Sequence, residues 1–342
     1  GIRGRMPDSL GCTLCESFNR GWNDIRSSGS CLLSDGASAI DALGQTDGTL
    51  SDPQPIYTKG DTHDAPNRLG MTNVSGRGIL LDSANDRLFT PDGLNHRILV
   101  YNLNSDDTLP DRIPDNVLGQ SNFYSGSAAN TQAGLNQPQS IAFDDTNDYL
   151  FVSQFEGNRV QVFDIGTIID GEAAVNVLGQ SDFTSLTQAT TQAGLNKATG
   201  IAYDSTNSRL FVNDNLNSRI VVYDTASITD GENAVNVLGQ TNFTSSSCGA
   251  TQSGLCTAHG IEYDSGNSIL YVADQGNHRV VTYDVASISD GENAVNVLGQ
   301  SNFTSNTAAT TQTGMNQPND VTYDSGNDRI FVADRLNHRV TV

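Results

Sequence analysis

The segment DGENAVNVLGQ occupies residues 230–240 and recurs unchanged at residues 290–300. Its last four residues, VLGQ, also occur at 117–120 and 177–180, so the spacing is sixty residues each time. A second marker, an arginine followed by a β-branched residue, recurs at nearly the same spacing at Arg97, Arg159, Arg219, Arg279 and Arg339. Self-similarity at a fixed period identifies a repeat architecture. The chain therefore holds five repeat units, and a head that does not share the period precedes them.

Each unit contains four strand-like segments separated by turn residues. In the third unit these segments span residues 200–204, 209–214, 218–224 and 235–240. They are rich in β-branched and aromatic residues, which suit the half-buried face of a pleated sheet. Four short strands per unit, repeated around a ring, are typical of a β-propeller. We predict an all-β fold, a β-propeller with five four-stranded blades of about 60 residues, with a linear β-solenoid as the alternative.

The period divides the chain into a head and a ring. We place a cysteine-containing N-terminal head at residues 1–36 and the propeller at residues 37–342. The blades are expected at about residues 74–120, 138–180, 198–240, 258–300 and 318–342.

The segment SAIDALGQ at residues 38–45 matches the fourth strand of a unit, although it precedes the first unit. The fifth unit ends at Val342, inside its third strand. We therefore expect residues 38–45 to close the ring as the outer strand of the last blade, which would cover an exposed strand edge. The alternatives are a chain cut from a longer array, and strand exchange with a neighbouring molecule, which would build a polymer.

The composition excludes two classes of partner. The chain has 342 residues, with 39 acidic against 18 basic side chains, so its formal net charge is −21. A chain this acidic repels phosphate backbones and anionic membrane surfaces. It also lacks the run of about 18 apolar residues that a membrane-spanning helix requires. We therefore expect neither nucleic-acid binding nor membrane insertion.

Several motifs recur in phase with the period. QPNDVTYD at 317–324 is followed by VAD at 332–334 and NHRV at 337–340, and VADQGNHRV at 272–280 and DGLNHRILVY at 92–101 have the same pattern. Over residues 74–342 the units resemble the NHL repeat, which implies a β-propeller. The near-identical blades with VLGQSNFTS also resemble long NHL-like repeat surface proteins of uncultured bacteria. The second and third units depart from the pattern, with Gln154 in place of the aspartate and Ser218 in place of the histidine.

The repeated aspartates and arginines have a structural interpretation. Asp274 and Arg279, like Asp334 and Arg339, are separated by the same offset in their units. Such pairs can brace the tight turn between the second and third strands. Catalysis rarely requires five copies of one residue pair, so we predict no catalytic role for them.

Two repeated patterns raise the question of a metal. His96, His278 and His338 occupy one position of the unit, but Asn158 and Ser218 fill it in the other units. We therefore interpret this position as turn packing or a hydrogen bond rather than a metal site. The Asp-Gly-Glu motifs at 170–172, 230–232 and 290–292 are expected to be turns, since they lack the ligand spacing of an EF-hand. We expect no cofactor, with calcium at these motifs as the alternative.

The cysteines indicate an oxidising compartment. Cys248 and Cys256 occur together in one unit and in no other, which predicts a disulfide worth about 2–3 kcal/mol. In the head we expect a second disulfide between two of three further cysteines, Cys12, Cys15 and Cys31. The CTLC spacing there is that of a redox motif, but it lacks the strand–helix context such a site needs. The sequons at Asn73, Asn242 and Asn302 matter only in a host that glycosylates.

The units differ most in the loops that join strand four to strand one and strand two to strand three. In a propeller these loops share one face, where ligands usually bind near the axis. A candidate ring around the axis consists of Gln139, Thr199, His259 and Asn319. Its candidate rim consists of Phe155, Glu156, Leu216, Gln275 and Arg335. Drift in unconstrained loops is the alternative explanation.

These features favour a protein that is not an enzyme. His259 is the one histidine of the blades that is not shared between units, and no G-x-S-x-G motif is present. We expect an extracellular or cell-surface module with a structural or interaction role that self-associates, even into a filament, through residues 1–36. In that head Trp22 and Phe18 lie among arginines, which would be attracted to the acidic body. The alternatives are a carbohydrate- or protein-binding adhesin and, more remotely, a propeller lyase or lactonase.

Overall fold

The computed structural model describes residues 39, 41–47, 49–55, 66–72 and 78–342. The head and its three cysteines, together with Asn73, lie outside these residues. The described chain is almost entirely β-structure, and no helix in it has the length and apolar character needed to cross a membrane.

Five antiparallel sheets follow one another along the chain. The first consists of β1 (Leu80–Asp82), β2 (Arg87–Asp92), β3 (Arg97–Asn102) and β4 (Asn116–Leu118). The second consists of β5 (Pro138–Asp144), β6 (Tyr149–Gln154), β7 (Arg159–Asp164) and β8 (Asn176–Leu178). The third consists of β9 (Ala198–Asp204), β10 (Arg209–Asp214), β11 (Arg219–Asp224) and β12 (Asn236–Leu238).

The fourth sheet consists of β13 (Ile261–Asp264), β14 (Ile269–Asp274), β15 (Arg279–Asp284) and β16 (Asn296–Leu298). The fifth has three strands, β17 (Pro318–Asp324), β18 (Arg329–Asp334) and β19 (Arg339–Thr341). Short 3₁₀ helices join the second and third strands of four sheets: η1 (Gly93–Asn95), η2 (Asn215–Asn217), η3 (Gln275–Asn277) and η4 (Arg335–Asn337).

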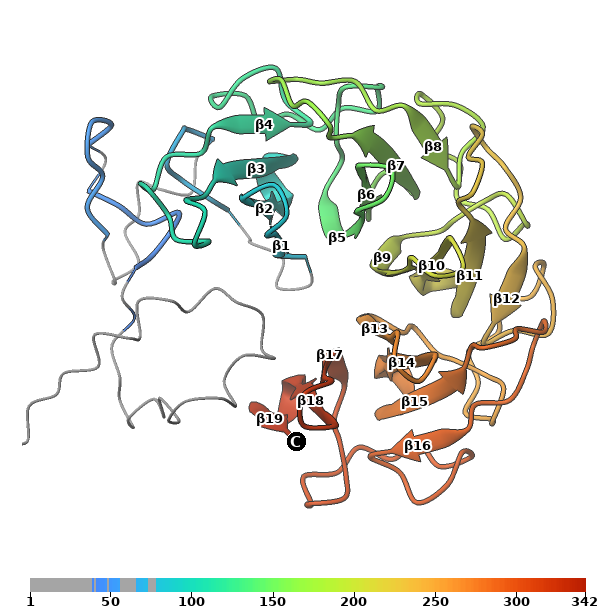
Figure 1. Cartoon of the computed structure of the whole chain (residues 1–342). Coiled ribbons are helices and arrows are strands. Elements are labelled where there is room, and N and C mark those ends of the chain that lie inside the picture. The colour runs from blue at the N-terminus through green and yellow to red at the C-terminus, as the bar shows by residue number, and fades with distance from the viewer. Residues whose placement is uncertain (1–38, 40, 48, 56–65, 73–77) are drawn as a thin grey trace, which may run out of the picture.

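The sheets are the blades of a β-propeller. Figure 1 shows them around a common centre, with the first strand of each blade innermost and the fourth outermost. Neighbouring blades contact each other through their inner strands, in the order β1, β5, β9, β13 and β17. The predicted all-β propeller with five blades is confirmed.

An aspartate shapes the turn that joins the first two strands of each blade. In the third blade Asp204 Oδ1 accepts hydrogen bonds from the backbone N–H groups of Thr206 and Asn207, at 3.1 and 3.2 Å. Its Oδ2 accepts another from Arg209 Nε at 3.0 Å. Ser208 between them adopts a φ of +50°. The aspartate side chain thus provides hydrogen-bond acceptors for the turn, as in an Asx turn. This contact explains why the D-S-x-N-x-R motif recurs along the chain.

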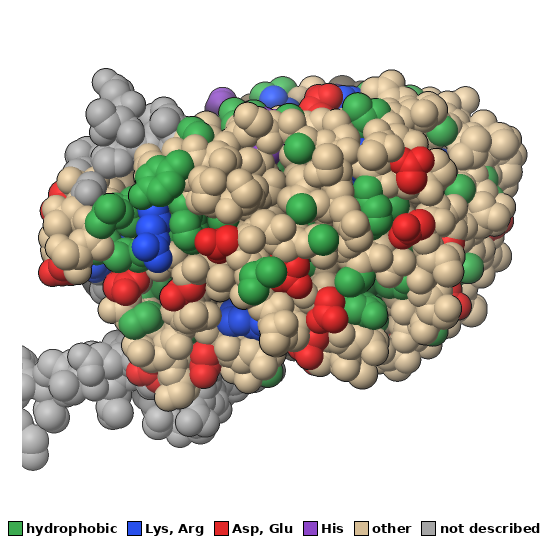
Figure 2. All heavy atoms as spheres, turned by 90° about the horizontal axis from the view of Figure 1, so that it is seen from above, with side chains coloured by type: hydrophobic (Ala, Val, Ile, Leu, Met, Phe, Trp, Pro, Cys, Tyr) green, Lys and Arg blue, Asp and Glu red, His purple; other side chains and the backbone are tan. Residues whose placement is uncertain are grey.

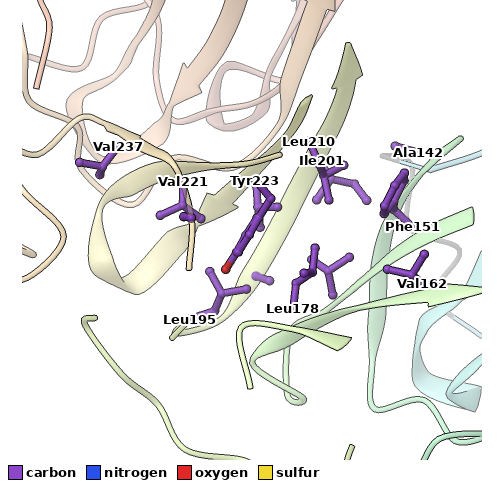
Figure 3. Close-up of a cluster of buried hydrophobic side chains, with 14 residues drawn as sticks. Ala142, Phe151, Val162, Leu178, Leu195, Ile201, Leu210, Val221, Tyr223 and Val237 are labelled. Carbon is purple, nitrogen blue, oxygen red and sulfur yellow. The ribbon is translucent and has the colours of Figure 1, made fainter. Parts of the chain in front are cut away.

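The core lies between the blades rather than within any one of them. In one cluster Phe151 and Val162 of the second blade pack with Ile201 and Tyr223 of the third, all nearly inaccessible to water. Figure 3 shows these side chains pointing toward one another from adjacent sheets. A single blade cannot bury both of its faces, so burial of apolar area between blades stabilises the ring.

Residues 43–45 lie against the first blade. Leu43 packs on the cluster that includes Met71 and Tyr101. Gly44, at a φ of +78°, approaches Met71 so closely that a Cβ would lie 3.0 Å from its Cγ. Gly119 approaches Leu135 in the same way, with a φ of +85°. Residues 43–45 thus take the place that the fourth strand of a preceding blade holds against the next one.

The fourth strand of the last blade is not formed within the described part of the chain. The fifth sheet ends at β19, and the one β-bridge near residues 41–47 joins Thr46 to Pro55. Four blades therefore have the predicted four strands and the fifth has three. Pairing of residues 38–45 with β19 remains a prediction.

Candidate functional site

The repeated Asp–Arg pair is buried inside its blade. Arg279 Nε donates a hydrogen bond of 2.7 Å to Asp274 Oδ2, and neither side chain is exposed. The other two nitrogens of the Arg279 guanidinium donate to the backbone oxygens of Phe303, Thr251 and Gly254. The guanidinium therefore joins the turn between the second and third strands to two loops, which agrees with a bracing role.

The pair recurs with almost the same geometry. The Nε to Oδ2 distances are 2.8, 2.7 and 2.8 Å for Arg97 with Asp92, Arg219 with Asp214, and Arg339 with Asp334. Burial raises the pKa of Asp214 to about 6, against the opposing effect of Arg219. No atom of the fully buried pairs reaches solvent, so they have no access to a substrate.

In the second blade a glutamine, Gln154, replaces the aspartate of the ion pair, and a second glutamine, Gln161, accompanies it. Gln154 Oε1 accepts a hydrogen bond of 2.8 Å from the backbone N–H of Asn136, and its Nε2 donates to Gln161 Oε1. Gln161 Nε2 then donates to the backbone oxygen of Thr131. Burial lowers the pKa of Arg159 to about 10, against the opposing effect of Asp182. The two glutamines thus take two of the partners that the aspartate and arginine hold elsewhere, while Arg159 keeps its hydrogen bond to the backbone oxygen of Phe183.

The histidine position is an acceptor between blades. His96 Nδ1 and His278 Nδ1 each accept a hydrogen bond of 3.0 Å from the next blade, from the backbone N–H of Gln137 and Gln317. Asn158 Oδ1 does the same for Lys197 at 2.9 Å. Burial lowers the pKa of both histidines, which favours the neutral acceptor form. Asparagine can replace histidine here because the position requires only an acceptor.

The Asp-Gly-Glu motif joins blades as well as forming a turn. Asp170, Asp230 and Asp290 each accept a hydrogen bond of 3.0 to 3.1 Å from the backbone of the preceding blade's outer strand. The glycine N–H that follows donates to the same strand, for example Gly231 to Val177 at 2.9 Å. Within the described residues no group of three or more His, Cys, Asp or Glu side chains could hold a metal ion. The motif therefore acts as a clasp, a contact that the sequence pattern did not predict.

The predicted disulfide between Cys248 and Cys256 is present. It lies beside Gly276, where a Cβ would be 2.5 Å from Cys256 Sγ and 2.8 Å from Cys256 O. At the corresponding position the third and fifth blades have Leu216 and Leu336. The fourth blade thus combines the disulfide with the glycine that leaves space for it.

The predicted axial ring is partly buried in contacts between blades. Thr199 is inaccessible to water, and its Oγ1 lies 3.3 Å from the backbone oxygen of His259. Asn319 Oδ1 accepts a hydrogen bond of 3.1 Å from the buried Gln275. Gln139, like His259 and Asn319, is half-buried. Thr199 and Gln275 therefore contribute to the scaffold rather than to an accessible surface.

The rim contains one compact polar and aromatic cluster. Lys197 Nζ lies 2.5 Å from Glu156 Oε2 and 4.9 Å from the centre of the Phe155 ring. Leu216 and Arg335 are exposed in the corresponding loops of the third and fifth blades. Lys197 was not among the predicted residues, although it lies in KATG at 197–200, one of the loops that vary between units.

A cavity of about 390 Å³ lies on the axis, toward the opposite end of the inner strands. Residues of β1, β5, β9 and β13 line it, and they include Ile141, Phe143, Tyr203, Tyr263 and Glu262. Strand register makes Glu262 the counterpart of Ala142 and Ala202 in the second and third blades. Sequence reasoning missed Glu262, although one acidic residue at an inner-strand position that is uncharged in the other blades was a readable signal.

The comparisons with known proteins agree with this architecture. The model of the family described as NHL repeat matches residues 315–342. A chain in the crystal structure of a nidogen/laminin complex is similar, with a TM-score of 0.51 at 18% identity, over 80% of this chain and 77% of that chain. This likeness concerns the fold alone. No curated protein matches the sequence. With five antiparallel blades and an NHL repeat matched at residues 315–342, the chain is a β-propeller that contains an NHL repeat.

Proposed function

We propose that the chain is a non-enzymatic, extracellular interaction module that self-associates through residues 1–36. The observation that carries this proposal is that the repeated polar residues serve the scaffold rather than a site. The Asp–Arg pairs, the histidine position and the Asp-Gly clasps form hydrogen bonds within the scaffold. What varies between blades is the surface of the loops, which is where partners of a rigid scaffold bind.

Three further features support the proposal. The Cys248–Cys256 disulfide is typical of proteins in oxidising compartments. Acidic side chains are dispersed over the face drawn in Figure 2 rather than gathered in one patch, so the body attracts single arginine side chains, such as the four of residues 1–36, by its overall charge. Lys197 covers one face of Phe155, which leaves less of that ring for stacking on a sugar and favours a protein partner over a glycan.

Sedimentation velocity over a range of concentrations tests self-association. We expect the full chain to form species larger than a monomer, and deletion of residues 1–36 to remove them. Leu216→Asp introduces a charge on the loop face, and Val235→Asp is its matched control, since these side chains are 48% and 47% exposed at opposite ends of the third blade. Self-association that survives the deletion unchanged would overturn the role of the head. A monomer at all concentrations would overturn self-association itself.

A further inference from the structure

The axial cavity combines one carboxylate with aromatic walls. Glu262 lines it together with Phe143, Tyr203 and Tyr263, and Ile141 and Ile201 complete the apolar part. The Tyr203 hydroxyl already donates to Asp144 Oδ2 of the neighbouring blade at 2.8 Å. The polar end of that tyrosine is thus engaged in the scaffold while its ring lines the cavity.

The surroundings of Glu262 contain negative charge without a balancing cation. Asp320 and Asp264 are the charged groups that act on it, and the backbone N–H of Tyr323 donates to it. Among the ion pairs of the described residues, none includes Glu262. Burial, reinforced by Asp320, raises the pKa of Glu262 to about 7. A cation in the cavity would remove this penalty, since an opposite charge favours the ionised carboxylate.

The shape and chemistry of the cavity select one class of ligand. An aromatic ring attracts a cation over its face, and a carboxylate in a partly desolvated site pairs with it directly. The apolar wall suits the methylene stem of a long basic side chain. We propose that the axial cavity binds a basic side chain, arginine or lysine, of a partner protein, with Glu262 as the recognising carboxylate.

This inference rests on the proposed role as an interaction module and names the chemistry of one partner contact. It also places that contact at the opposite end of the axis from the variable loops. The cavity reaches Asp145 and Ser205 in the turns after the first strands, whereas the predicted ring lies where those strands begin. Failure of this inference therefore leaves the loop face and the head untouched.

Isothermal titration of the full chain at pH 8 with the capped tripeptide acetyl-Gly-Arg-Gly-amide tests the proposal. The matched neutral probe contains citrulline in place of arginine. Glu262→Gln removes the charge, and Glu262→Ala restores the residue of the second and third blades, which keeps the test open if one variant folds poorly. Glu232→Gln is the control, since it makes the same change in net charge in an outer loop.

We expect the arginine peptide to bind the wild type at least about tenfold more tightly than it binds either Glu262 variant, because the site loses a charge-assisted pair. Glu232→Gln should bind the arginine peptide as tightly as the wild type does. The citrulline peptide should bind the wild type no more tightly than the arginine peptide binds the Glu262 variants. Equal binding of the arginine peptide to wild type and Glu262→Gln would overturn the proposal. Agmatine distinguishes a protein side chain from a free small cation as the ligand. Tighter binding of agmatine than of the arginine peptide would identify a small cation as the ligand and overturn the proposal.

Discussion

Asp230 Oδ1 accepts a hydrogen bond of 3.0 Å from the backbone N–H of Val177, which belongs to the outer strand of the preceding blade. Gly231 N–H donates back to Val177 O at 2.9 Å. The loop of one blade thereby covers the edge of its neighbour's last strand, where unpaired backbone groups would otherwise remain open to other chains. A motif that resembles a simple turn thus stabilises the interface between blades.

Substitution of the clasp aspartate measures its contribution. Asp230→Ala leaves the Val177 N–H without its partner and should lower the free energy of unfolding by about 1–2 kcal/mol. Asp230→Asn retains the Oδ1 acceptor and should recover most of that loss. Chemical denaturation of both variants checks this, and equal losses in the two would show that the hydrogen bond is not what stabilises the interface.

The buried Asp–Arg pairs should differ in cost according to exposure. Asp214→Ala leaves Arg219 buried without its partner, which should destabilise the protein by about 3–5 kcal/mol. Asp334→Ala should cost less, because the Arg339 side chain is 30% exposed and water can solvate it. Thermal or denaturant unfolding of the two variants gives the comparison. An equal cost would contradict the dependence on burial.

The disulfide and Gly276 should depend on each other. Gly276→Leu places side-chain atoms against Cys256 Sγ, so it should hinder formation of the Cys248–Cys256 bond and leave free thiols that a thiol reagent counts. In a Cys248→Ala, Cys256→Asn background, the same leucine should be tolerated, as Leu216 and Leu336 are in sister blades. Equal destabilisation in both backgrounds would show that another neighbour excludes the leucine.

The histidine acceptors predict a stability loss in acid. Burial lowers the pKa of His278 in the folded protein, so the unfolded chain binds its proton more tightly, and stability falls as pH drops below about 6.5. Protonation of Nδ1 also removes the acceptor for Gln317 N–H, worth about 1 kcal/mol. His278→Asn introduces the residue that the second blade has at this position, Asn158, and should lessen the fall between pH 7 and 5. An unchanged pH profile would show that His278 does not titrate in this range on unfolding.

The ionisation of Glu262 should change stability with pH in the opposite direction. Its folded pKa lies above the unfolded value, so the folded protein binds this proton more tightly and loses stability as pH rises from about 4.5 to 7. The shift corresponds to a penalty of up to about 3 kcal/mol above pH 7. Glu262→Gln should therefore stabilise the protein at pH 8 and have little effect at pH 4.5. A stabilisation that is independent of pH would indicate altered packing instead of charge.

The repeat period predicted most of the fold because each unit carries its own turn and strand signals. The sequence could not predict that Asp230 contacts Val177, since that pairing depends on how one blade faces the next. Thr199 was placed in a binding ring because its loop varies, but a neighbouring blade buries it. Glu262 is the opposite case, a residue that lines the cavity but was not predicted. Comparison of the inner strands within the chain would have identified it.

An image of the assembled protein by electron cryomicroscopy tests the central claim most directly. If the propeller is an interaction module that self-associates, the image will show repeated contacts between neighbouring molecules, with residues 1–36 of one chain against the acidic body of the next. The five blades will be intact within each molecule. Isolated propellers without such contacts, at concentrations where sedimentation reports larger species, would contradict this account.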